Sequence, residues 1–253
     1  MPAEESTPAI VIRARDYSES DRIVTLLTRD FGKLSGIAKG AKASRRRFER
    51  KLEPFSHVTL YFRRRPHGQL VFITRAERGE NPPPELEDDL GKIALGSYMI
   101  ELADALTTEE AEAAEAYLVL ANALETLGRG AAATALRQAY ELRMLSAAGF
   151  GLEFARCRVC SRVPEAEDGA VYFVVSRGGI VCVRCRANAP EGAVRLAAAN
   201  AIALSGLCTA RFDEATVLPH GGRDGTVALG RFFASILDRK LRSVEFLDSL
   251  LEL

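Results

Sequence analysis

The chain has 253 residues, of which 47% are hydrophobic, and its 34 Lys and Arg residues balance 34 Asp and Glu residues. This size and composition predict a globular protein with a sizeable core and up to three domains. The sequence contains no run of about 18 apolar residues, which excludes a membrane-spanning helix. Its first ten residues lack the pattern of a secretion signal, so we expect a cytoplasmic protein.

Charge is distributed unevenly along the chain. Residues 1–79 hold 17 Lys and Arg against 9 Asp and Glu, a net charge of +8, whereas residues 80–140 hold 3 against 12, a net charge of −9. A basic first part suits a polyanion and an acidic second part repels it. The stiff segment Asn81-Pro82-Pro83-Pro84 separates the two parts and predicts domains at residues 1–80 and 81–253.

Five short strands are predicted before the prolines, because β-branched residues alternate there with polar ones. They cover Ala9–Arg15, Asp21–Thr28, Lys33–Lys39, His57–Arg63 and Gln69–Ala76. A β-sandwich usually needs about seven strands, so five strands with a long third connection favour a small closed barrel of the OB-fold type. OB-folds commonly hold oligonucleotides.

The connection after the third predicted strand carries the highest local charge. Between Lys33 and Lys51 there are eight basic residues and one acidic residue, Glu49. Such a cluster attracts phosphate, although a solvated loop is the alternative interpretation. Arg63, Arg64 and Arg65 are expected at the loop that joins the fourth and fifth strands, where a charged hairpin tip is the alternative. The acidic residues Asp16, Glu19 and Asp21 make the first hairpin loop less suited to phosphate. The candidate DNA-binding residues are Lys33, Lys39, Lys42, Arg45, Arg46, Arg47, Arg50, Arg63, Arg64 and Arg65.

After the prolines the apolar period changes from 2 to about 3.6 residues, which predicts an α-helical domain. The expected helices are Leu86–Leu106, Glu109–Leu127 with Thr108 as N-cap, Ala131–Ala148, Glu191–Cys208, Thr226–Leu241 and Val244–Leu251. The whole chain is therefore expected to be an α+β protein in which a barrel precedes a helical domain.

Four cysteines form the most specific chemical motif. Cys157 and Cys160 make one CxxC pair, and Cys182 and Cys185 make a second one after 21 intervening residues. This spacing is typical of a tetrahedral zinc site, and four thiolates leave no open position for water, so one structural Zn²⁺ is expected. The alternating residues between the pairs predict a hairpin, and the module is expected at residues 154–190, inserted into the helical domain. A redox role would need a thioredoxin-like setting, which is not seen.

No catalytic residues are expected. A zinc deaminase would show His-x-Glu before Pro-Cys-x-x-Cys, but His57, His67 and His220 are followed two positions later by Thr59, Gln69 and Gly222. There is also no phosphate-binding loop for ATP. A zinc-ribbon transcription regulator is a further alternative, but it would read DNA through a recognition helix, whereas the basic residues here lie on a loop and strands.

These features together resemble the bacterial RecO family of recombination mediators. The resemblance rests on Val11–Lys42, on Leu52-Glu53-Pro54-Phe55, on the Cys157–Cys185 ribbon and on the closing Leu241–Leu247. It implies a DNA repair protein that binds single- and double-stranded DNA and anneals complementary strands. It also implies work with RecR and single-stranded DNA-binding protein to load RecA, in the cytoplasm at the nucleoid. The resemblance maps DNA contact onto Lys33, Lys39, Lys42 and Arg45 to Arg47.

Overall fold

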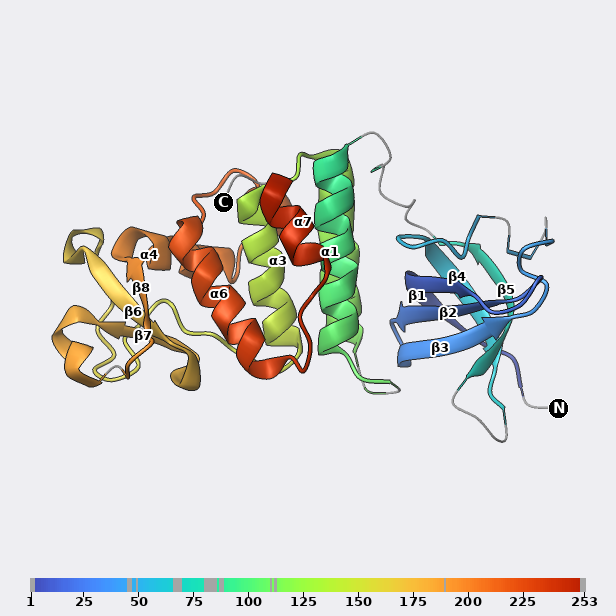
Figure 1. Ribbon diagram of the computed structural model, residues 1–253, viewed down its shortest axis with the longest axis horizontal. Helices are drawn as coiled ribbons and strands as arrows, with labels where there is room; N and C mark the ends of the chain where they lie inside the picture. The colour runs from blue at the N-terminus through green and yellow to red at the C-terminus, as the bar shows by residue number, and fades with distance from the viewer. Residues whose placement is uncertain are drawn as a thin grey trace. The chain divides into compact units, whose positions relative to one another are not determined.

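A computed structural model describes residues 3–44, 47, 48, 50–65, 70–79, 86, 89–109, 111, 113–188 and 190–250. The chain forms two compact units, Met1–Arg129 and Gly130–Leu253. Figure 1 labels most of the helices and strands named below. The described residues do not include Arg45, Arg46, His67 or the predicted boundary at Asn81–Pro84. The domain division at residues 80–81 therefore stays a prediction.

Five strands of the first unit close into a barrel, which confirms the predicted OB-like architecture. The strands are β1 (Glu5–Asp16), β2 (Arg22–Thr28), β3 (Gly32–Ala38), β4 (His57–Arg63) and β5 (Val71–Arg78). Their order around the barrel is β1-β2-β3-β5-β4, and only the β3–β5 pair among them is parallel. β1 is longer than predicted because its first half pairs with β4 and most of its length pairs with β2, with a register shift between Val11 and Arg13.

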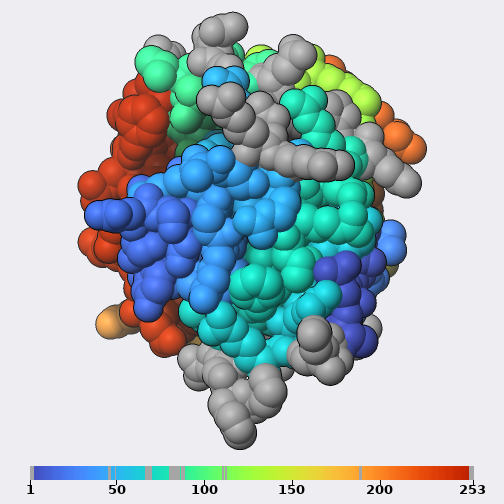
Figure 2. Space-filling model, turned by 90° about the vertical axis from the view of Figure 1, so that its right-hand side faces the viewer, coloured from blue at the N-terminus to red at the C-terminus, as the bar shows by residue number. Residues whose placement is uncertain are grey.

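Alternating side chains of the strands fill the barrel. Val11, Leu26 and Phe62 are examples of strand residues that are fully buried in this core. Phe48 and Leu52 from the connection between β3 and β4 pack into the same core, so this connection is anchored to the barrel by apolar burial. Figure 2 shows one face of the molecule, and barrel residues coloured blue to turquoise occupy the centre of this view.

Among the residues that the structure describes, two helices follow the barrel in the first unit, α1 (Leu90–Leu106) and α2 (Ala114–Arg129). The prediction that the second helix starts at Glu109 with Thr108 as N-cap was wrong. Glu109 forms a β-bridge with Lys33, and its carboxylate accepts a hydrogen bond from Ser35 Oγ at 2.9 Å. Pairing with the barrel thus holds this residue out of the helix. None of the described helices is long and apolar enough to span a membrane.

In the described part of the second unit, five helices accompany a small sheet. The helices are α3 (Thr134–Ala147), α4 (Ala198–Leu207), α5 (Phe212–Ala215), α6 (Gly222–Ile236) and α7 (Ser243–Leu250). The sheet has the order β7-β6-β8, with β6 at Ala170–Val174, β7 at Gly179–Cys182 and β8 at Val194–Ala197. Short 3₁₀ turns lie at Ala166–Asp168 (η1), Val175–Arg177 (η2) and Val183–Asn188 (η3).

The predicted helix Glu191–Cys208 is correct only for its second part. Val194–Ala197 instead forms β8, which pairs antiparallel with β6 and leads directly into α4. A buried polar residue of α3, Gln138, organises the start of α6. Its Oε1 accepts a hydrogen bond from the Gly221 amide at 2.7 Å, and its Nε2 donates to Thr226 Oγ1 at 3.0 Å.

Candidate metal centre and nucleic-acid interface

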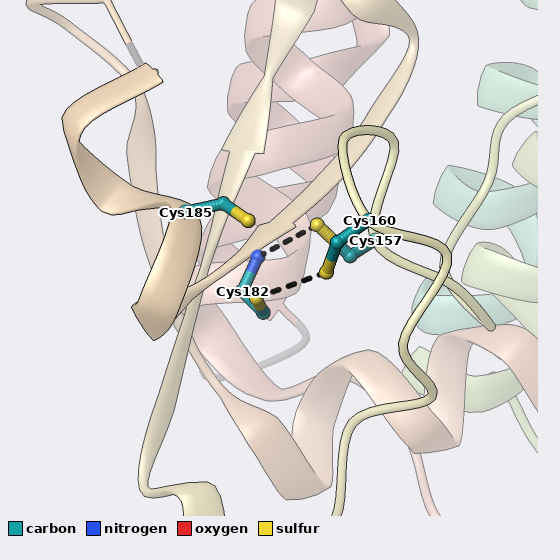
Figure 3. A group of neighbouring side chains, drawn as sticks. All are labelled: Cys157, Cys160, Cys182 and Cys185. Carbon is teal, nitrogen blue, oxygen red and sulfur yellow. Dashed lines mark hydrogen bonds between the residues drawn. The ribbon is translucent and has the colours of Figure 1, made fainter.

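The four predicted cysteines converge in the second unit. Cys157 and Cys160 lie on a turn before the sheet, Cys182 ends β7, and Cys185 lies in η3. Their four sulfur atoms all lie within 4.8 Å of one another, and the side chains point toward a common centre (Figure 3). The hairpin of β6 and β7 brings the second pair beside the first, as the sequence predicts. The four thiols can therefore hold a metal ion.

Backbone geometry fixes the first cysteine pair. Ser161 adopts a left-handed conformation at φ 61°, and its amide donates to the Cys157 carbonyl at 2.9 Å, which turns the chain tightly after Cys160. The amides of Val159 and Cys182 donate to Cys157 Sγ at 3.4 and 3.3 Å. Amide donors aimed at a sulfur atom stabilise its thiolate form. The turn is thus built to present an anionic sulfur.

The thiols differ in acidity. Burial opposes ionisation of Cys157, but the amide donors of Cys182, Cys160 and Val159 outweigh it and lower its pKa to about 6. Cys185 has its pKa raised to about 12, chiefly by its hydrogen bond with Cys160, with burial and the nearby sulfur of Cys182 as further causes. The four thiolates can therefore coexist only if a cation compensates their charge.

A basic pocket opens on the barrel in the first unit. Its volume is about 520 Å³, and it lies between the start of β2 and the connection from β3 to β4. The lining residues are Arg22, Ala41, Lys42, Ala43, Ser44, Phe48, Arg50, Leu52 and Glu53. Three of these side chains are cationic, and the small residues among the others allow close approach to the backbone. The pocket thus combines positive charge with space for a ligand.

Acidic side chains already pair with two of the pocket cations. Asp16 accepts from Lys42 Nζ at 2.8 Å and from Arg22 Nε at 3.2 Å, and Glu53 accepts from Arg22 at 2.6 Å. The hydrogen bond from Lys42 is the main cause that lowers the pKa of Asp16 below its usual 3.8. A phosphate that binds Lys42 or Arg22 must therefore compete with these carboxylates.

The structure separates the predicted DNA-binding residues into groups. Lys42 and Arg50 line the pocket, and Arg47 lies beside it with its guanidinium over the Phe48 ring and a hydrogen bond to the Lys39 carbonyl. Lys33 lies elsewhere: its Nζ donates to the Asp104 carbonyl at 2.8 Å and pairs with the Asp104 carboxylate at 3.2 Å. Only 14% of the Lys33 side chain is exposed, so it serves the docking of α1 onto β3.

The arginines at the end of β4 form a third group. Arg64 pairs with Glu5 at 3.2 Å and covers the Phe31 ring, and Arg63 lies 4.0 Å from Glu4. Arg65 is exposed. Sequence reasoning missed Arg22, which lies opposite Ala38 in the β2–β3 pair and thus next to the basic connection. Its position at the start of a predicted strand was the available signal.

A closed OB-like barrel with a basic pocket, followed by helices and a four-cysteine sheet, defines a class of OB-like barrel proteins with a candidate metal site. Comparison with protein families agrees with this class. Residues 1–80 match the model of the N-terminal part of recombination protein O, and residues 87–245 match the model of its C-terminal part.

Similar proteins from several bacteria carry the name DNA repair protein RecO. The protein from Anaeromyxobacter sp. strain Fw109-5 is 38% identical over 249 residues, which cover 94% of this chain and 93% of the relative. The protein from Syntrophus aciditrophicus strain SB is 30% identical over 252 residues, which cover 98% and 96%. The chain belongs to the RecO family of DNA repair proteins.

Proposed function

We propose that this protein is a recombination mediator that binds single- and double-stranded DNA through its barrel and anneals complementary strands. The observation that carries the proposal is the basic pocket of Arg22, Lys42 and Arg50 on a closed OB-like barrel, in a chain of the RecO family. Phosphates supply most of the affinity of such basic surfaces through counterion release. The function requires binding and alignment of strands, not a catalytic group.

The family membership also suggests the partners. We infer that the protein acts at the bacterial nucleoid with RecR and single-stranded DNA-binding protein, and that it helps load RecA onto coated strands. An acidic stretch such as residues 80–140 repels phosphate and is better suited to protein partners than to DNA.

The cysteine cluster fits one structural Zn²⁺ held by Cys157, Cys160, Cys182 and Cys185. Zn–S bonds of about 2.3 Å in a tetrahedron place the sulfur atoms about 3.8 Å apart. Cys160 Sγ and Cys182 Sγ are 3.7 Å apart. Four protein ligands leave no position for a reactive water, so the ion would stabilise the fold of the ribbon.

The proposed DNA interface is tested by charge reversal. The triple variant Lys39→Glu, Lys42→Glu and Arg50→Glu should weaken binding to all DNA sequences, and the slope of log K against log salt should flatten by nearly one unit for each lost phosphate contact. Arg129→Glu is the matched control, because Arg129 is a strongly exposed cation on α2 of the same unit. An unchanged slope in the triple variant would contradict the proposal.

A further inference from the structure

Tyr17 is the most exposed aromatic residue that the structure describes. It lies in the connection between β1 and β2, and 64% of it is exposed. Three other aromatic rings of the barrel are covered, since the Arg75 guanidinium lies 3.6 Å from the centre of the Tyr61 ring and Phe31 packs edge-on against Phe62. An uncovered ring on an otherwise polar loop presents a flat apolar face to solvent.

The loop that carries Tyr17 has a fixed conformation. The Tyr17 amide donates to the Asp21 carbonyl at 3.0 Å, and the Asp21 amide donates to Ser18 Oγ at 3.1 Å. The start of the basic connection holds the loop from the other side, since the Gly40 amide donates to Asp21 Oδ1 at 2.9 Å and the Lys42 amide donates to the Ser20 carbonyl at 3.1 Å. The ring is thus attached to a backbone that is ordered before any ligand binds.

The Lys42 ammonium group contacts both residues that flank Tyr17 in the sequence. Its Nζ is 2.8 Å from the carboxylate of Asp16 and 3.1 Å from the carbonyl of Ser18, the residues directly before and after Tyr17. Lys42 also lines the basic pocket. A pocket-lining cation therefore contacts the two neighbours of an exposed ring in the sequence, so the β1–β2 loop and the connection from β3 to β4 together supply both kinds of group that a nucleotide needs for its base and its phosphate.

We propose that Tyr17 is a stacking platform for an unpaired base, and that Lys42 holds an adjacent phosphate. The inference rests on the proposed DNA-binding function and adds the chemistry of its substrate. Both faces of a base inside a duplex are already stacked on neighbouring bases, whereas an unpaired base can lay one face on the tyrosine ring. Tyr17 would therefore favour single strands over duplex at this site and keep their pairing edges free for a complementary strand.

Affinity measurements test the stacking role. Tyr17→Ala should weaken binding of a single-stranded oligonucleotide by about tenfold and leave duplex binding within about twofold of the wild type. Tyr17→Phe is the matched control, because it retains the ring and removes only the hydroxyl, and it should bind like the wild type. Both variants should fold, since backbone groups and Asp21 hold the loop.

A spectroscopic measurement reports stacking directly. The chain contains no tryptophan, so Tyr17→Trp introduces a single fluorescent indole. Single-stranded DNA should quench this fluorescence strongly, and a duplex of the same sequence should quench it much less. Phe246→Trp provides the reference, because Phe246 is 49% exposed in α7 of the second unit and its replacement should show no strand-dependent quenching.

The outcomes separate the inference from the function on which it rests. If the wild-type protein binds DNA and Tyr17→Ala retains full affinity for single strands, the stacking role is wrong and the proposed function is unaffected. Equal loss of single-strand and duplex affinity in Tyr17→Ala would also overturn it, because the ring would then not discriminate between them. Wild-type protein that binds neither form would overturn the proposed function, and the inference with it.

Discussion

Gly32 shows how one residue couples the barrel to the helices of the first unit. It opens β3 in the left-handed region at φ 65°, and an added Cβ would lie 1.8 Å from the Ala111 carbonyl oxygen. Gly40 has nearly the same conformation, φ 66°, but its added Cβ would meet only the Arg47 guanidinium at 3.5 Å. The two glycines therefore share the conformational requirement and differ in steric overlap.

We expect Gly40→Ala to lower the free energy of unfolding by roughly 1–2 kcal/mol, the cost of a left-handed L-residue. Gly32→Ala should lower the free energy of unfolding by about 4 kcal/mol or more, because the backbone around Ala111 must also move. Urea unfolding of both variants measures the difference. Equal losses would contradict the close approach of Ala111 to Gly32.

His57 gives the first unit a pH-dependent stability. It is 6% exposed on β4, and its Nε2 atom is buried without a hydrogen-bond partner. Burial lowers its pKa from the usual 6.5, and the charge of Glu125 opposes this only in part. As pH falls below 6.5, the unfolded chain therefore binds a proton that the folded chain does not, and stability decreases with falling pH.

The urea midpoint should thus be lower at pH 5.5 than at pH 7.5. His57→Leu should reduce this pH dependence of the midpoint, because it removes the titrating group. The exposed His220 supplies the control, since His220→Asn should retain the wild-type pH profile. A His57→Leu variant with an unchanged profile would show that other groups cause the dependence.

Sequence reasoning was strongest for residues whose chemistry is tied to local spacing. The two CxxC pairs are local motifs, and the structure brings all four sulfur atoms together. Lys33 and the loop of Tyr17 were harder to interpret, because their environments depend on Asp104 and Lys42, which lie far away in the sequence. Charge and residue type alone do not show which cations are already neutralised.

At the level of elements, the strands were predicted better than the helix starts. β4 has the predicted bounds, since alternation along His57–Arg63 is set by the barrel interior. Val194–Ala197 was assigned to a helix because the apolar residues after it follow a helical period. In the structure its buried Val194 and Leu196 alternate with exposed Arg195, and pairing with β6 decides its conformation.

The ribbon is the element whose stability should depend on metal. Cys182→Ser should remove one sulfur ligand from the cluster, so the zinc content should fall and residues 154–190 should become sensitive to proteolysis. Cys208→Ser is the control, because Cys208 is the C-cap of α4, outside the four-cysteine cluster. The barrel belongs to the other unit, and DNA affinity should change little.

Metal analysis of the purified protein and limited proteolysis test this prediction together. Retention of one zinc ion by Cys182→Ser, or equal protection of the ribbon in both variants, would contradict a structural four-thiolate site. Loss of the metal with no loss of protection would show that the sheet folds without it.

At the level of the whole molecule, the compact unit extends beyond the barrel. Lys33 and Arg13 both pair with Asp104 of α1, and Ser35 donates to Glu109. A fragment that ends at residue 84 would lack these partners and expose the barrel surface that they cover. We therefore expect the fragment 1–129 to unfold at a clearly higher urea concentration than the fragment 1–84.

The comparison uses the same denaturant series for both fragments, and Asp104→Asn in the longer fragment tests the contribution of the ion pairs to the difference. Equal midpoints for the two fragments would show that α1 and α2 do not stabilise the barrel. The first compact unit ends at Arg129, whereas the family model of the N-terminal part matches only residues 1–80.

The carboxylates of Asp16 and Glu53 also have a kinetic consequence for the proposed annealing of strands. Lys42 and Arg22 can transfer from a departing phosphate to these acids without passing through an unpaired state. A lower barrier to dissociation shortens the residence time of each contact, so a strand can be exchanged in small steps until its complement is in register. The pocket is thus suited to rapid turnover of DNA contacts more than to tight storage of a strand.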